Sequence, residues 1–238
     1  MLLPKIIAHR GASGYAPENT MAAIMDAVQK GAKAIEFDVN VSADGIPILL
    51  HDETLDRTTN GSGPVVEKTF AELEQLDAGS WFSPNFSGIS IPSLSDVLNG
   101  VFQSDLALNL ELKPTPGWEQ ETVRAVVQAL KKNMSPVLVS SFNVEALKLF
   151  HEQMPDHPIA LISKRVPENA VLILQTLGCN AIHCKSIHLQ KKDVERLVNA
   201  GFIVRAYTVN DPERAKQLFS WGVQSVFTDY PDKLIGNT

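Results

Sequence analysis

Lys5-Ile6-Ile7-Ala8-His9-Arg10-Gly11 is the stretch from which we infer the fold. A short apolar run ends in a histidine, an arginine and a glycine turn, which is typical of a buried strand with polar groups at its tip. The pattern recurs in Ile35-Glu36-Phe37-Asp38-Val39 and in Leu108-Asn109-Leu110-Glu111-Leu112-Lys113. We therefore predict three strands that bring charged side chains to one place.

Strand-like runs alternate with segments of helical period along almost the whole chain. The predicted strands are residues 5–9, 34–40 with 47–51, 107–113, 137–140, 158–162, 181–184, 203–208 and 225–228. The predicted helices are residues 20–30, 93–100, 118–133, 144–153, 167–177, 191–200 and 212–221. About eight such repeats predict a parallel sheet closed into a (β/α)8 TIM barrel, with a doubly wound open sheet as the alternative.

Residues 52–92 interrupt this alternation. They include Asn60-Gly61-Ser62-Gly63-Pro64, a short helix-like segment at 69–76 and the aromatic Trp81-Phe82-Ser83-Pro84. A loop of this length inside a compact domain is usually functional. We predict a single domain over residues 1–238, with 52–92 as a small insertion after the second strand that packs over one end of the barrel.

The composition restricts the class of protein. The chain has 238 residues, of which 44% are hydrophobic and 20% charged, and its net charge is -6. Without a run of Lys or Arg we expect no nucleic-acid partner. No apolar run reaches the roughly 18 residues of a membrane span, and residues 1–5 leave no room for a signal peptide, so we expect a cytoplasmic protein without a membrane partner. We expect Cys179 and Cys184 to be reduced core residues.

Three carboxylates follow the strand period. Glu36 and Asp38 share one face of their strand, and Glu111 shares a face with Asn109 and Lys113 on another. In a barrel the apolar faces would meet the outer helices and the carboxylates would line the axis. Buried carboxylates need neutralising charge, so the pattern favours a divalent ion with oxygen ligands; the alternative is structural ion pairing.

Two histidines and two cations occupy comparable positions. His9 and His51 each end a strand, and imidazoles at one rim are candidates for a general acid and a general base. Arg10 and Lys113 would add positive charge beside the carboxylates, which suits a phosphate oxyanion. The alternative role of both cations is to balance the acidic groups.

Two further residues are weaker candidates. Tyr207 shares a strand face with Arg205 and is either a wall of the site or a core aromatic, and His183 also closes a strand. Gly11 and Gly14 form neither a GxGxxG nor a Walker motif, so nucleotide binding has little support.

Taken together, the ordered motifs resemble those of the glycerophosphodiester phosphodiesterase family along nearly the whole chain. They are Ala8-His9-Arg10-Gly11, Pro17-Glu18-Asn19-Thr20, Glu36-Phe37-Asp38-Val39, Pro47-Ile48 to His51-Asp52, Leu55-Asp56-Arg57-Thr58-Thr59-Asn60-Gly61, Ile91-Pro92-Ser93-Leu94, Glu111-Leu112-Lys113 and Thr228-Asp229. The resemblance implies a TIM barrel with a small insertion after the second strand. It also implies hydrolysis of glycerophosphodiesters, which are small molecules, to glycerol 3-phosphate and an alcohol.

The resemblance also assigns roles to individual residues. It implies Mg²⁺ or Ca²⁺ held by three carboxylates, an acid/base pair of two histidines, and two cations that contact the phosphate. By motif these are Glu36, Asp38 and Glu111 for the metal, His9 and His51 for proton transfer, and Arg10 and Lys113 for the phosphate. Glu18-Asn19 would support the first loop. Tyr207 stands in a segment where the family often has tryptophan, so it would contact the glycerol side of the substrate.

Two other functions remain open at this point. One is a phospholipase-type lyase that releases a cyclic phosphate, and the other is a non-catalytic module that binds phosphodiesters. The sequence leaves open the head group, the choice between Mg²⁺ and Ca²⁺, the occurrence of a cyclic phosphate intermediate, the role of His183 and the oligomeric state.

Overall fold

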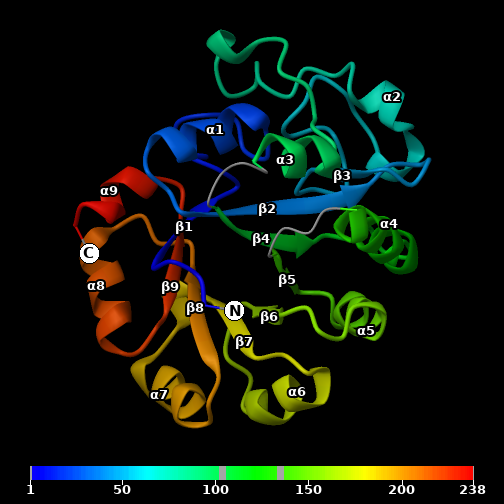
Figure 1. Cartoon of the computed structure of the whole chain (residues 1–238). Helices are drawn as coiled ribbons and strands as arrows, with labels where there is room; N and C mark the ends of the chain where they lie inside the picture. Colours follow the sequence, from blue (N-terminus) through cyan, green and yellow to red (C-terminus); the bar gives the residue numbers. More distant parts are fainter. Residues whose placement is uncertain (1, 102–105, 133–136, 238) are drawn as a thin grey trace.

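A computed structural model describes residues 2–101, 106–132 and 137–237 and shows a barrel of parallel strands (Figure 1). The barrel strands are β1 (Ile6–His9), β2 (Ala34–Val41), β4 (Ala107–Leu112), β5 (Val137–Ser141), β6 (Ile159–Ser163), β7 (Ala181–Lys185), β8 (Ile203–Tyr207) and β9 (Ser225–Thr228). They are ordered β1-β9-β8-β7-β6-β5-β4-β2, and β1 also pairs with β2. This closure confirms the predicted TIM barrel and excludes the open sheet. A ninth strand, β3 (Pro47–Leu49), pairs antiparallel with β2.

Helices surround the barrel and connect its strands. They are α1 (Met21–Gln29), α3 (Leu94–Gly100), α4 (Glu119–Lys132), α5 (Val144–Gln153), α6 (Ala170–Leu177), α7 (Lys191–Asn199) and α8 (Pro212–Ser220). Each predicted helix is therefore present, although residue 133, the predicted end of one, lies outside the described residues. Helix α6 begins three residues later than predicted, because Ala170 N–H donates to Pro167 O and closes a turn there. The sequence reasoning missed α9 (Pro231–Ile235), which has a proline in its first turn.

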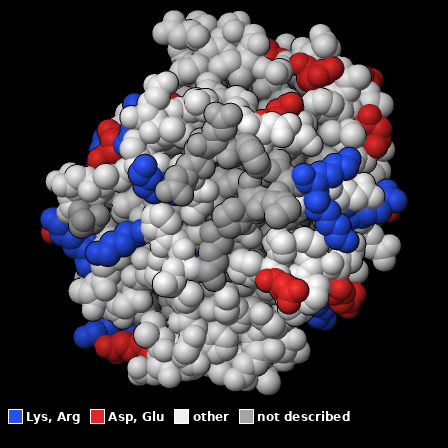
Figure 2. All heavy atoms as spheres, viewed as in Figure 1, with Lys and Arg blue, Asp and Glu red and all other residues white. Residues whose placement is uncertain are grey.

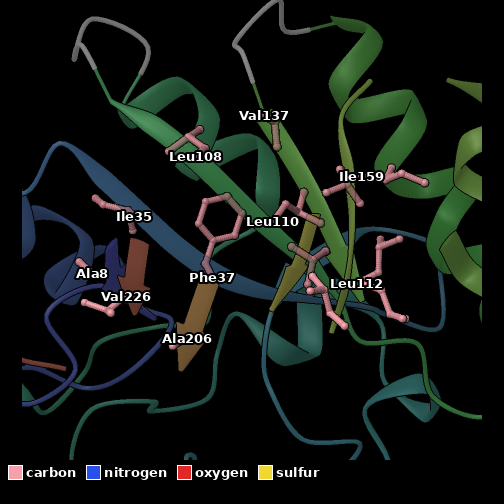
Figure 3. Close-up of a cluster of buried hydrophobic side chains, with 14 of the residues drawn as sticks. Ala8, Ile35, Phe37, Leu108, Leu110, Leu112, Val137, Ile159, Ala206 and Val226 are labelled. Carbon is pink, nitrogen blue, oxygen red and sulfur yellow. The ribbon is translucent and has the colours of Figure 1, made fainter. Parts of the chain in front are cut away.

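The strand period separates an outer from an inner core. Outward side chains such as Ile35, Phe37 and Leu110 are completely buried between the barrel and its helices (Figure 3). A smaller cluster, which includes Ile7 and Phe227, packs separately from them. Successive side chains of a strand point to opposite faces of the sheet. Because Ile35 and Phe37 point outward to the helices, Glu36 and Asp38 point into the barrel.

Residues 50–93 leave the barrel after β3 and contain their own short elements. These are η1 (Val65–Glu67), α2 (Phe70–Leu73) and η2 (Pro84–Phe86), and α2 lies within the helix-like segment predicted at 69–76. A third apolar cluster, which includes Leu55, Leu73 and Ile91, packs beneath them. The segment extends outward beside β3 and α3 (Figure 1).

Charged side chains of both signs are mixed on the surface. On the face shown in Figure 2, Lys, Arg, Asp and Glu side chains lie mostly toward the periphery of the molecule. No described helix combines the length and the apolar character needed to cross a membrane. Cys179 and Cys184 are buried and free, as predicted.

Candidate active site

Three carboxylates meet inside the barrel because of the register between neighbouring strands. Asp38 on β2 pairs with Glu111 on β4, and Glu36 on β2 pairs with His9 on β1. One ligand oxygen from each carboxylate lies within 4.8 Å of the others. Glu36 is only 3% exposed and Asp38 only 1%. The predicted cluster is therefore assembled, with little contact with bulk water.

Part of the acidic cluster has no hydrogen-bond donor among the described residues. Glu36 Oε1 and Asp38 Oδ1 are buried and accept no hydrogen bond from any described residue. Burial and the charges of Asp38 and Glu111 raise the pKa of Glu36 well above its ordinary value. Burial and the charge of Asp38 raise the pKa of Glu111 to about 7, against the opposing effect of Lys113. Buried carboxylate oxygens without partners fit the oxygen-rich coordination of a hard divalent cation.

Arg10 contacts the cluster through both its backbone and its side chain. It has a φ of 55°, a strained conformation for a residue with a Cβ atom, and Gly11 follows with a φ of 80°. This turn points the Arg10 N–H at Glu36 Oε2, 2.9 Å away, and Arg10 Nε lies 3.1 Å from Asp38 Oδ2. Arg10 also favours the ionised form of Asp38. Burial alone would raise the pKa of that carboxyl, but the charges of Arg10, His51 and Lys113 lower it below its ordinary value.

His51 is held between an acid and a base. Its Nδ1 lies 2.5 Å from Asp52 Oδ1, and its Nε2 lies 3.2 Å from Lys113 Nζ. An ionised carboxylate only accepts and an ammonium only donates, so the neutral imidazole carries its proton on Nδ1 and has a lone pair on Nε2. Burial lowers the pKa of His51, and the charge of Asp38 only partly offsets this effect. His51 is therefore suited to accept a proton at Nε2.

His9 has an equivalent partner from the other end of the chain. Its Nδ1 lies 2.7 Å from Asp229 Oδ1, so the imidazole donates to that carboxylate. Ser13 Oγ and Asn210 Nδ2 also donate to Asp229, at 3.0 and 2.7 Å. Burial alone would raise the pKa of Asp229, but these hydrogen bonds and the His9 charge lower it to about 2. An ionised carboxylate beside an imidazole stabilises the imidazolium form.

An ion-pair network connects the two sides of the site. Arg57, from the segment after β3, donates to Asp52 Oδ2 at 2.5 Å and to both oxygens of Glu18. Glu18 in turn accepts from Arg10 Nη1 at 2.6 Å. The network thus connects Asp52, which contacts His51, with Arg10, which contacts Asp38.

Asn19 supports a predicted metal ligand directly. Its Nδ2 donates to Asp38 Oδ2 at 2.8 Å, and its Oδ1 accepts from the Asp38 backbone N–H at 3.0 Å. The left-handed φ of 58° at Asn19 makes this two-sided contact possible. Because amide and carboxylate are both buried, Asn19 sets the orientation of Asp38.

A cavity of about 530 Å³ opens over these groups. Seven of the eight predicted site residues line it: His9, Arg10, Glu36, His51, Glu111, Lys113 and Tyr207. Asp38 joins them through the carboxylate cluster. The structure therefore brings together all eight residues that the sequence singled out.

Two residues of the cavity wall have partners of their own. Tyr207 donates its hydroxyl hydrogen to Ser163 O at 3.2 Å, and its ring packs edge-on against Phe142. His183 is buried at the cavity wall, where burial and the Arg205 charge lower its pKa well below the ordinary value. Arg205 Nη1 lies 3.3 Å from His183 Nε2. His183 is thus a neutral wall residue of the site.

The sequence reasoning gave no site role to Asp52, Arg57 or Asp229, and Glu18 and Asn19 only a general role in supporting the first loop. These residues hold the predicted ones in place. All five lie in the motifs quoted above, which was the available signal. Asp229 and its partner His9, for example, are 220 residues apart in the sequence. Strand periodicity, which is a local pattern, could not pair them.

Two imidazole–carboxylate pairs in a TIM-barrel cavity that also holds an acidic cluster and several cations fit a hydrolase for phosphate esters. The sequence model of the glycerophosphoryl diester phosphodiesterase family matches residues 9–233. The chain belongs to this family and is a phosphoric diester hydrolase.

Similar proteins agree with this assignment. A glycerophosphodiester phosphodiesterase of Bacillus altitudinis is 36% identical over 240 residues, which cover 98% of this chain and 97% of the relative. One from Bacillus subtilis is 34% identical over 245 residues, covering 95% of this chain and 83% of the relative. The structure of an Oleispira antarctica phosphodiesterase in complex with the product sn-glycerol-3-phosphate has a TM-score of 0.96 and 40% identity. It covers 99% of this chain and 96% of that chain.

Proposed function

We propose that this enzyme hydrolyses glycerophosphodiesters to glycerol 3-phosphate and an alcohol, with a divalent metal ion and with His9 and His51 as the acid/base pair. The main observation behind the proposal is that the two imidazoles have equivalent surroundings. Each is held at Nδ1 by a carboxylate, Asp229 or Asp52, and each lines the cavity that also contains the acidic cluster. The product named for the Oleispira antarctica relative supports the glycerol 3-phosphate half of the substrate.

Members of this family generally depend on a divalent metal ion. Glu36, Asp38 and Glu111 would hold Mg²⁺ or Ca²⁺, because their carboxylates are close together and each has one buried oxygen without a hydrogen-bond partner among the described residues. Such an ion would supply positive charge to polarise the phosphoryl group. The three carboxylates leave the choice between the two ions open, since both accept oxygen ligands and differ in coordination number.

The remaining groups bind the phosphate and move protons. Arg10 and Lys113 offset negative charge on the phosphoryl oxygens. His51, whose pKa is lowered by burial, takes the proton of the attacking oxygen at Nε2. If that oxygen is water, glycerol 3-phosphate forms directly; if it is the neighbouring glycerol hydroxyl, a cyclic phosphate forms first and water then opens it. His9, whose Nδ1 is held by the Asp229 carboxylate, gives a proton to the leaving alkoxide.

A coupled assay for glycerol 3-phosphate tests this proposal. Purified enzyme is treated with EDTA, and Mg²⁺ or Ca²⁺ is restored separately, with glycerophosphocholine and glycerophosphoinositol as substrates. We expect activity to disappear with EDTA and to return with one of the ions. Phosphorus NMR of the products distinguishes the lyase, because a lasting cyclic phosphate would contradict simple hydrolysis. Unchanged turnover in EDTA would contradict metal dependence.

We also propose that the whole chain is one phosphodiesterase domain, with residues 52–92 as an insertion within it. The separate apolar cluster of that segment supports the boundary, and the contacts of Arg57 with Glu18 support its link to the barrel site. The cytoplasmic location and the absence of nucleic-acid and membrane partners stay predictions.

A further inference from the structure

Two lysines line the wall of the cavity that lies opposite the acidic cluster. In the closed barrel, β7 is four strands from β2 in either direction, and β6 is four strands from β1. Lys185 ends β7, and Lys164 directly follows β6. Both line the same cavity as Glu36 and His9. The cavity therefore has an acidic side, where we place the metal, and a basic side across from it.

The strand period explains why both lysines point into the cavity. Ile162 and His183 line the cavity and pair with each other across β6 and β7. Lys164 and Lys185 are each two residues further along, so they lie on the same inward face. Continuing this register by two residues puts Lys164 opposite Lys185. Both side chains are exposed, so solvent and salt screen the repulsion between them.

Among the described residues, no carboxylate forms an ion pair with either of these two lysines. The other cations of the cavity are paired, since Arg10 contacts Asp38 and Glu18, and Lys113 contacts Glu111. Lys164 and Lys185, in contrast, form no ion pair with any residue in the described part of the chain. The local field is positive: burial lowers the pKa of the nearby His188, and the charges of Arg165 and Lys185 lower it further. In a chain of net charge -6, this is a local concentration of basic groups.

We propose that Lys164 and Lys185 form a subsite for a second anionic group, a phosphate or a carboxylate, on the alcohol of the glycerophosphodiester. This inference rests on the proposed function. The scissile phosphate would be held on the opposite side of the cavity, by Arg10, Lys113 and the ion that the carboxylate cluster would bind. The glycerol moiety carries no charge, so the group that reaches the lysines belongs to the alcohol. The preferred substrates are thus diesters of anionic alcohols, and a cationic alcohol such as choline is disfavoured by repulsion.

The test uses two probes that differ by one phosphate, glycerophosphoinositol and glycerophosphoinositol 4-phosphate. We expect the native enzyme to show a kcat/KM about 10-fold higher for the phosphorylated probe, on the scale of roughly two partly exposed ion pairs. In the double variant K164Q/K185Q this ratio falls to about one. The charge-preserving variant K164R/K185R keeps most of the preference. Raising the salt concentration reduces the ratio in the native enzyme, because exposed charges are screened.

K131Q/K132Q is the matched control, because it removes the same net charge from the exposed last turn of α4. It should leave the ratio of the two probes unchanged. A double variant K164Q/K185Q that loses activity on both probes equally would overturn the proposal, since the lysines would then act on the scissile phosphate. A native ratio near one would also overturn it while leaving the hydrolase function intact. Absence of glycerol 3-phosphate from every probe would instead refute the proposed function itself.

Discussion

Replacing Asp229 by asparagine tests whether an ionised carboxylate is what makes His9 useful in proton transfer. Burial alone would raise the pKa of Asp229, yet its hydrogen bonds and the His9 charge lower it from 3.8 to about 2. At about 1.4 kcal/mol for each pH unit, this corresponds to about 2.5 kcal/mol in favour of the carboxylate. The Asp229 side chain is 28% exposed. Screening by solvent therefore leaves about half of this energy, about 1.2 kcal/mol.

Only part of that energy comes from His9, so it is an upper limit on the direct charge interaction between the two side chains. About 1.2 kcal/mol corresponds to a kcat reduced by up to roughly 8-fold in Asp229→Asn through this interaction alone. The reduction is larger if the new amide turns its NH₂ group toward His9 Nδ1, since the imidazole must then carry its proton on Nε2. We expect KM to change little, because Asp229 does not line the cavity.

The assay is the initial rate of glycerol 3-phosphate release by the metal-loaded enzyme. Asp232→Asn is the matched control, because Asp232 lies three residues away and accepts only from the Tyr15 hydroxyl, at 3.1 Å, among the described residues. Native kcat in Asp229→Asn, with His9→Ala strongly impaired, would refute the orienting role of the carboxylate.

The same substitution has a defined effect on stability against pH. The pKa of Asp229 is lower in the folded chain than in the unfolded chain, so its contribution is present above about pH 4 and is lost as the pH falls through about 2. Urea unfolding should therefore show Asp229→Asn to be less stable than the native enzyme at pH 6. The two free energies of unfolding should converge only below about pH 2. A constant difference at all pH values would contradict the assignment.

Three further outcomes are expected. His51→Ala should reduce kcat roughly 100-fold or more, the usual scale for a lost proton-transfer group, and near-native turnover would remove His51 from the mechanism. Asn19→Ala should weaken metal binding by roughly 10-fold or more in calorimetric titration, because Asn19 orients Asp38; unchanged affinity would contradict this. Burial raises the pKa values of Cys179 and Cys184 to about 12, so neither should react with Ellman's reagent at pH 8 until urea unfolds the chain, and rapid labelling of the folded protein would show that the thiols are accessible.

The sequence by itself determined the strands of the barrel, the helices between them and the identity of the charged groups. Alternation of apolar and polar residues at 35–39 and 108–112 is a local property, and burying one face of each strand leaves only one direction for Glu36, Asp38 and Glu111. Eight successive repeats of strand and helix then favour closure, because each parallel strand needs a covering helix. The ordered motifs carried the resemblance to the family.

Only the tertiary structure decided which of these groups meet. Asp229 reaches His9 because β9 pairs with β1 when the barrel closes. Lys164 and Lys185 face the acidic cluster because β6 and β7 lie across the barrel from β1 and β2. Such contacts depend on closure and register, which are set by the packing of the whole barrel, whereas strand patterns are set by residues next to one another along the chain.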